Sequence, residues 1–157
     1  MAACLFAACS VRVAKKWLHA TTLSLSGNSH IHEGDTAEET RLFTKDDVEL
    51  FSKLTGDFNP IHLNDSYAQK QKFDGRLVHG ALINGLISCL LGTKLPGPGC
   101  VVVKELLEFP APLYVDEKVV AKVVITSVRK TIVKCSFNCC TENGKEVLKG
   151  EAKLLLK

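Results

Sequence analysis

The chain has 157 residues, 46% of them hydrophobic and 24% charged, which is typical of a globular protein with one domain and one hydrophobic core. Its net charge of +3 comes from residues 1–32, which contain Arg12, Lys15 and Lys16 and no carboxylate, so residues 33–157 carry 17 basic and 17 acidic residues. A neutral body excludes the basic patch of a typical nucleic-acid-binding domain, and no apolar stretch approaches the ~20 residues of a transmembrane helix. We therefore expect no nucleic-acid partner and no membrane insertion.

The amino-terminal segment has the composition of a mitochondrial presequence. It is free of acidic residues and rich in Ala, Ser and Thr, and its apolar and basic residues can occupy different faces of one helix. A disordered tail without a targeting role is the alternative. The polar segment 27–39 predicts a linker. We thus expect a presequence and linker over residues 1–40, a single domain over residues 41–157, and a location in the mitochondrial matrix.

Three helices are predicted after the linker. Thr44 is a hydroxyl N-cap before acidic residues, and apolar residues recur at helical spacing until Gly56, which is placed to end the first helix. A second short helix is predicted over residues 65–71. The segment 80–91 is apolar on nearly all sides, which predicts a buried helix.

The rest of the chain is strand-like. Prolines and glycines interrupt the chain at residues 95–99, and Pro110 and Pro112 exclude a central strand where they occur. Asn143-Gly144 is typical of a type I′ hairpin turn. Segments rich in Val, Ile, Thr and Phe predict four strands, at residues 101–109, 118–128, 131–140 and 146–156. The order of elements predicts an α+β fold in which an antiparallel sheet wraps around one buried helix.

The seven cysteines predict neither disulfides nor a metal site. Cys4 and Cys9 lie in the amino-terminal segment, and the other five form no Cys-x-x-Cys pair. Free thiols fit a reducing compartment. Cys135 and Cys139 fall on one face of a predicted strand, so we expect them to be buried.

The densest group of potential catalytic residues is the segment from Thr55 to His62. Asn59 precedes Pro60, whose ring fixes the backbone, so the segment is stiff and can hold Asp57 and His62 at a set separation. A carboxylate and an imidazole that face one pocket can share a water molecule and transfer protons as a pair. The alternative is that Asp57 caps a local turn and His62 is an ordinary loop residue.

A second group, Val78-His79-Gly80, begins the buried helix. The first turn of a helix has unpaired N–H groups, and Gly80 allows a ligand oxygen to approach them, as a carbonyl that becomes an enolate requires. Close packing of the helix at Gly80, with His79 as a core or capping residue, is the alternative. Ser88 follows on the same helix, and its hydroxyl could bond the Asn84 carbonyl or a catalytic carboxylate.

Together these motifs resemble the MaoC-like (R)-specific enoyl-thioester hydratases, the hydratase 2 family. The resemblance rests on Gly56-Asp57-Phe58-Asn59-Pro60-Ile61-His62, then Val78-His79-Gly80, then Leu95-Pro96-Gly97-Pro98-Gly99, and extends from about Phe43 to the carboxyl terminus. With the presequence, the chain is similar to mitochondrial 3-hydroxyacyl-thioester dehydratases.

The resemblance implies a hot-dog fold, usually dimeric, and reversible addition of water to a trans-2-enoyl thioester carried on acyl carrier protein or coenzyme A. It implies no metal and no redox cofactor. It assigns the catalytic roles to Asp57, His62, the Gly80 amide and a supporting Ser88. The neighbouring motif residues Asn59, Val78 and His79 are expected to contact substrate.

Two other functions remain open at this stage. A hot-dog thioesterase would use a carboxylate and water to cleave the same class of substrate, but it does not need His62. A non-catalytic, dimeric acyl-thioester-binding protein would leave the pairing of Asp57 with His62 unexplained.

Overall fold

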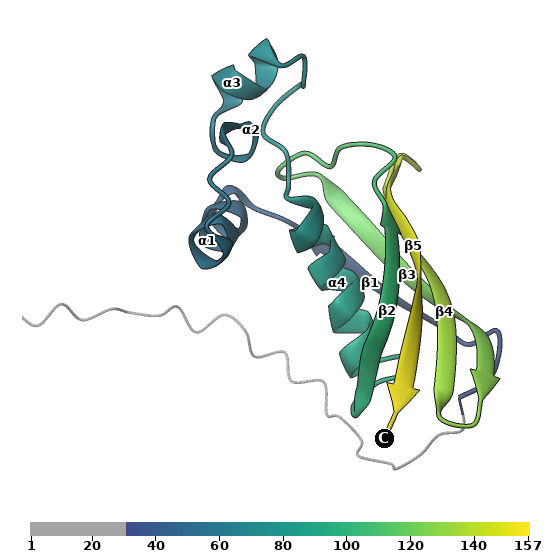
Figure 1. Ribbon diagram of the computed structural model, residues 1–157. Coiled ribbons are helices and arrows are strands. Elements are labelled where there is room, and N and C mark those ends of the chain that lie inside the picture. The colour runs from purple at the N-terminus through teal and green to yellow at the C-terminus, as the bar shows by residue number, and fades with distance from the viewer. Residues whose placement is uncertain (1–30) are drawn as a thin grey trace, which may run out of the picture.

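A computed structural model describes residues 31–157, so the predicted presequence lies almost wholly outside the described part of the chain. One antiparallel sheet curls around helix α4 (Gly80–Thr93), as Figure 1 shows. The strands follow the order β1-β3-β4-β5-β2, with β1 at Thr36–Leu42, β2 at Cys100–Glu108, β3 at Lys118–Arg129, β4 at Ile132–Thr141 and β5 at Glu146–Leu156. This confirms the predicted α+β class.

Strand β1 corrects the predicted linker. Thr36–Leu42 pairs with β3 along its whole length, from Thr36 opposite Val124 to Leu42 opposite Lys118. The predicted linker therefore becomes sheet at Thr36, and a domain boundary after residue 40 would cut the strand. Its sequence gave no signal because an edge strand is held by backbone pairing and can carry many polar side chains.

The predicted hairpin is present, but its turn is not type I′. Side chains alternate along β4, and Val133, Cys135, Phe137 and Cys139 are buried as expected. At the turn, Gly144 has a positive φ of 78°, whereas Asn143 does not. A type I′ turn needs positive φ at both central residues, so the connection between Thr141 and Glu146 is a different turn that contains a left-handed glycine.

Helix α4 is buried on one face only. Ile83, Leu86, Ile87, Leu90 and Leu91 pack into the core against the sheet. The opposite face is exposed and consists of small side chains; we call it the small-residue face of α4, formed by Ala81, Gly85, Ser88, Cys89 and Gly92. The prediction that this helix is buried all round was therefore wrong for a single chain.

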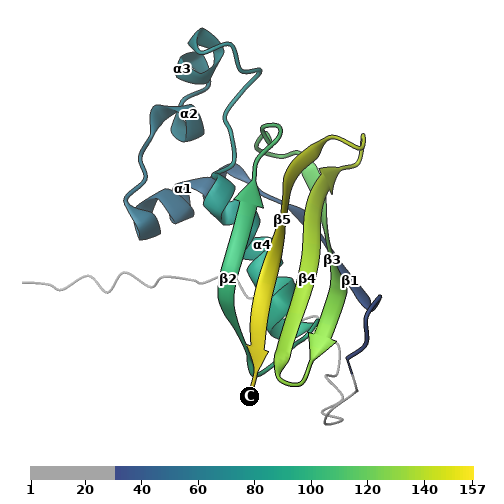
Figure 2. The same ribbon diagram turned by 45° about the vertical axis from the view of Figure 1, so that its right-hand side comes forward.

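Three short helices connect β1 to α4: α1 (Lys45–Thr55), α2 (Pro60–Leu63) and α3 (Asp65–Lys70). They lie beyond the amino-terminal end of α4, to one side of the sheet (Figures 1 and 2). Thr44 forms the capping box of α1, and Gly56 ends that helix with φ of 79°. No helix within residues 31–157 is long and apolar enough to cross a membrane.

Candidate active site

The segment between α1 and α2 holds Asp57 in a fixed position. Asp57 Oδ1 accepts a hydrogen bond from the Asn59 N–H at 3.2 Å, and Asn59 Oδ1 accepts one from the Ile61 N–H at 3.3 Å. Asn59 is thus the N-cap of α2, and Pro60 occupies its first turn, where a missing N–H is no loss. The stiff loop that the sequence predicts is partly a one-turn helix, which leads directly from Asp57 to His62.

The tautomer of His62 follows from its hydrogen bond. Its Nδ1 lies 2.8 Å from the carbonyl oxygen of Leu77, and a carbonyl oxygen can only accept. Nδ1 therefore carries a proton, and Nε2 is the nitrogen that can gain or lose one. The side chain is buried, with 8% exposed, which holds the ring in place.

His79 lies behind His62. The two rings stack with centroids 3.8 Å apart, and Phe51 packs against His79 at 5.0 Å. His79 Nε2 is 3.3 Å from both the Asp57 carbonyl oxygen and the Ser52 hydroxyl, and 4.0 Å from Asp57 Oδ2. Burial, followed by the nearby charge of protonated His62, lowers the pKa of His79, so this ring is neutral at pH 7.

Asp57, His62 and His79 together form one compact group. A carboxylate oxygen and one nitrogen from each ring all lie within 4.8 Å of one another. Since a hydrogen bond spans about 2.8 Å, one water molecule can contact both Asp57 and His62. A carboxylate and two imidazoles are also the side chains that bind a metal ion such as zinc, so this group has the donors of a three-ligand metal site.

An apolar cavity of about 400 Å³ adjoins this group. His62 and Gly80 both line it, and Gly80 is the first residue of α4, so its N–H has no acceptor within the helix. The remaining lining side chains are all apolar: Phe73, Leu77, Val78, Ile83, Phe109, Pro110, Ala111, Pro112, Leu113 and Val147. The cavity therefore has an imidazole ring and the first amide of a helix in its otherwise apolar wall.

The other predicted site residues have different outcomes. Val78 lines the cavity, as a substrate contact would. Asn59 caps α2, and His79 Nε2 lies 3.3 Å from the Asp57 carbonyl oxygen; neither residue lines the cavity, and their contact with substrate stays a prediction. Ser88 is exposed about 12 Å along the axis of α4 from Gly80, and neither the Asn84 carbonyl nor Asp57 is its hydrogen-bond partner within the described residues.

Sequence reasoning missed Ser52 and Phe109. Ser52 is buried on α1 and reaches His79, and Phe109 packs on Gly80. Both are ordinary residues at the sequence level, and only the folded chain brings them to the site.

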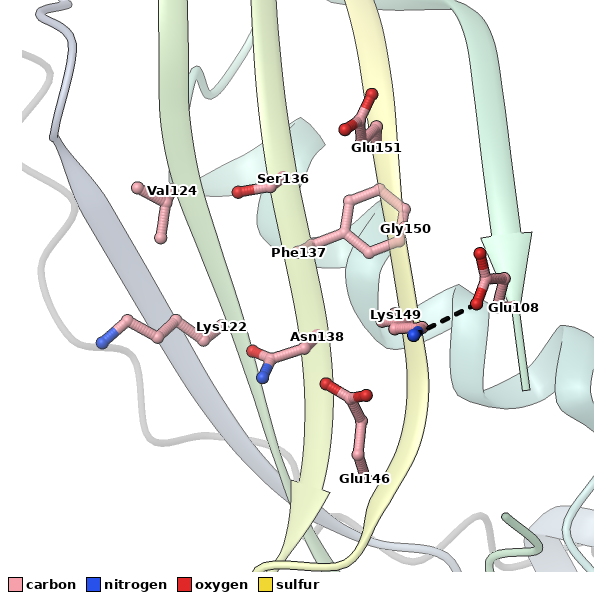
Figure 3. A pocket seen from close by; sticks show the side chains of 10 residues that line it. All are labelled: Glu108, Lys122, Val124, Ser136, Phe137, Asn138, Glu146, Lys149, Gly150 and Glu151. Carbon is pink, nitrogen blue, oxygen red and sulfur yellow. Dashed lines mark ion pairs between the residues drawn. The ribbon is translucent and has the colours of Figure 1, made fainter. Parts of the chain in front are cut away.

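A larger hollow, of about 520 Å³, lies on the face of the sheet away from α4. Figure 3 shows its charged side chains around the Phe137 ring and Gly150, with Lys149 paired to Glu108 at 3.2 Å. Its charged side chains are three glutamates and two lysines, and the hollow contains no carboxylate–imidazole pair. The cavity beside His62, which does adjoin such a pair, is therefore the candidate active site.

Comparison with known proteins agrees with this site. Residues 28–145 match the family model of the MaoC-like domain. The chain is 39% identical over 127 residues to an (R)-specific enoyl-CoA hydratase of Rhodospirillum rubrum, covering 80% of this chain and 88% of that protein. It is 31% identical over 138 residues to a mitochondrial 3-hydroxyacyl-[acyl-carrier-protein] dehydratase of Arabidopsis thaliana, covering 85% and 82%. The solved (R)-hydratase from A. caviae superposes with a TM-score of 0.79 at 32% identity, covering 83% of this chain and 100% of that one.

Fold and site together define a hydro-lyase with the hot-dog fold, as the resemblance implied. More particularly, the chain belongs to the MaoC-like family.

Proposed function

We propose that this chain catalyses the reversible dehydration of an (R)-3-hydroxyacyl thioester to the trans-2-enoyl thioester. The observation that carries the proposal is the placement of Asp57 and His62 within reach of one water molecule, beside the Gly80 amide and an apolar cavity. Relatives named as (R)-specific enoyl-CoA hydratases and 3-hydroxyacyl dehydratases support the same reaction.

In the proposed mechanism the thioester carbonyl accepts a hydrogen bond from the Gly80 N–H, which stabilises the enolate that forms when the proton at C2 leaves. Asp57 and His62 together take up that proton and protonate the departing hydroxyl at C3, so that one water is released. Hydration runs through the same steps in reverse. His62 Nε2 is the nitrogen available for this exchange, because Nδ1 is bound to Leu77.

The test is turnover of a trans-2-enoyl thioester, followed by loss of its absorbance. Asp57→Asn and His62→Ala should each lower kcat by about 10²–10⁴, the usual contribution of general acid–base catalysis. Asp46→Asn, an exposed carboxylate in the first turn of α1, is the matched control and should keep full activity. Full activity in both site variants would overturn the proposal, and release of free thiol from a saturated acyl thioester would favour a thioesterase.

We also propose that the enzyme works as a homodimer. Strand β2 pairs with β5 on one side only and exposes Val101, Val102 and Val103 at the free edge of the sheet. Beside it lies the exposed small-residue face of α4, whose short side chains permit close approach of a second helix. Ser88 belongs to this face, so the supporting role that the resemblance gives it is proposed to act on the Asp57 of the partner copy.

The proposed setting is fatty-acid synthesis in the mitochondrial matrix, on acyl carrier protein or coenzyme A. The acid-free, basic segment 1–32 and the mitochondrial dehydratases of Arabidopsis thaliana and Solanum lycopersicum support it. A fusion of residues 1–40 to a fluorescent protein should enter mitochondria, and replacing Arg12, Lys15 and Lys16 by Gln should abolish import. Turnover of the same enoyl chain on acyl carrier protein and on coenzyme A would show which carrier the enzyme uses.

A further inference from the structure

Phe109 is held against the first residue of the catalytic helix. It follows the last residue of β2 and precedes Pro110, which restricts its backbone. A Cβ atom on Gly80 would lie only 2.9 Å from Cε1 of the Phe109 ring and 3.1 Å from Cζ. The ring therefore lies directly on the residue whose amide faces the reacting carbonyl in the proposed mechanism.

The same ring forms part of the wall of the 400 Å³ cavity, yet 49% of Phe109 is exposed. Leaving half of a phenylalanine in water forgoes part of the hydrophobic stabilisation that its burial would provide. An apolar ligand chain in the cavity would cover this surface and recover that stabilisation.

The lining of the cavity identifies which part of a thioester it accepts. From a carbonyl placed at the Gly80 amide, one arm of the substrate is hydrocarbon, whereas the other carries the amide groups of the pantetheine. Apart from His62, every lining side chain is apolar, and none offers a partner to a buried amide. The hydrocarbon arm is therefore the one that matches.

We propose that Phe109 determines acyl-chain specificity, by closing the wall of this cavity over the hydrocarbon chain next to Gly80. The inference rests on the proposed function and adds to it the group that limits the size of the acyl chain. Shortening Phe109 enlarges the cavity beside the reacting carbons and leaves Asp57, His62 and the Gly80 amide in place.

The test compares wild type with Phe109→Ala and Phe109→Leu, each as the full chain, on trans-2-enoyl-CoA substrates of increasing chain length. We expect Phe109→Ala to raise the ratio of kcat/KM for long over short chains at least tenfold, mainly through KM, with Phe109→Leu between it and wild type. Leu54→Ala is the control, because Leu54 on α1 is 76% exposed and does not line the cavity. Its length profile should equal that of wild type.

Binding of saturated acyl-CoA, which has no double bond to hydrate, separates this inference from the proposed reaction. The same shift toward longer chains in Phe109→Ala would support the inference even if wild type proved inactive. An active wild type whose length profile and saturated-chain affinities do not change in Phe109→Ala or Phe109→Leu would overturn the inference and leave the proposed reaction standing. Should Phe109→Ala fail to fold, Phe109→Leu provides the same comparison.

Discussion

The imidazole rings of His62 and His79 stack with their planes 26° apart. Each ring forms a hydrogen bond to a backbone carbonyl oxygen, but the two rings use different nitrogens to do so. His62 donates from Nδ1 to Leu77, whereas His79 uses Nε2 toward the Asp57 carbonyl oxygen. The stack therefore connects the two halves of the proposed catalytic pair, because one ring carries the exchangeable proton and the other holds the backbone of the carboxylate.

His79→Leu should lower kcat about 10–100-fold with a smaller change in KM, because the Asp57 backbone loses its donor while the substrate cavity is untouched. His79→Gln retains an N–H at a similar position and should recover much of the lost kcat. Steady-state kinetics on one enoyl thioester gives kcat and KM for the two variants. Equal losses in the two variants would contradict a positioning role and indicate only a packing defect.

Stability should fall as the pH decreases below about 6.5. The pKa of His79 is lowered in the folded chain, so between that value and 6.5 the unfolded chain binds more protons and is favoured as the pH decreases. Melting temperatures of wild type and His79→Gln from pH 8 to pH 5 test this. The Tm of His79→Gln should fall less steeply with decreasing pH than that of wild type. Equal slopes would show that His79 does not cause the loss of stability.

A second loss of stability is expected on the alkaline side. Burial raises the pKa of the Cys139 thiol from 9.0 to about 12, so the unfolded chain loses this proton at a lower pH than the folded one. Stability contributed by the thiol is complete below pH 9 and falls by roughly 1.4 kcal/mol for each pH unit above it. Burial also raises the pKa of Cys135, to about 11, so Cys139→Val should make the fall of Tm between pH 9 and 11 shallower without abolishing it, whereas Cys89→Val, at an exposed thiol, should leave the slope as in wild type.

Gly80→Ala should be harmful because of the Phe109 ring. The added Cβ meets that ring at 2.9 Å, and overpacking of this kind costs about 1–3 kcal/mol. The double variant Gly80→Ala/Phe109→Ala should recover part of the stability, with a coupling energy of roughly 1 kcal/mol or more in a denaturation cycle. Additive effects would show that the two residues do not constrain each other.

Gly85→Glu tests the proposed dimer. A Cβ at Gly85 meets no atom within 4 Å, so a single chain should fold normally, but a charge on the small-residue face should separate two copies. Light scattering should report a monomer and turnover should be lost, because Ser88 of the second copy is then missing. Gln69→Glu, at an exposed position of α3, is the control and should remain dimeric.

Elements fixed by local chemistry were predicted well. Helix α1 followed from Thr44 and Gly56, and β5 was placed over residues 146–156 from its strand-forming composition after the Asn143-Gly144 turn. Strand β1 was missed because its pairing with β3 is non-local and its side chains are largely polar. The spacing of Asp57 and His62 allowed a shared water but left a turn cap as the alternative, and the pairing came from the family motif; in the structure a carboxylate oxygen and a ring nitrogen lie within 4.8 Å.

What the sequence could not give depended on packing between distant segments. His79 lies behind His62 because α1 and the segment before α4 meet there, and this packing brings its Nε2 to 3.3 Å from the Asp57 carbonyl oxygen. Phe109 contacts Gly80 because edge strand β2 ends beside the start of α4. Ser88 was expected to be buried, and the exposed face on which it lies is apparent only once the opposite face of α4 is packed.

The proposed acid–base pair and the proposed oxyanion amide belong to different parts of the architecture. Asp57 and His62 lie in the excursion between β1 and α4, whereas Gly80 begins the helix around which the sheet folds. The helix can therefore keep its amide for binding a thioester carbonyl while residues 44–75 change in sequence. Proteins that share this sheet and helix could therefore acquire new reactions on the same class of substrate. Only the segment between β1 and α4 would have to change, and the core would stay the same.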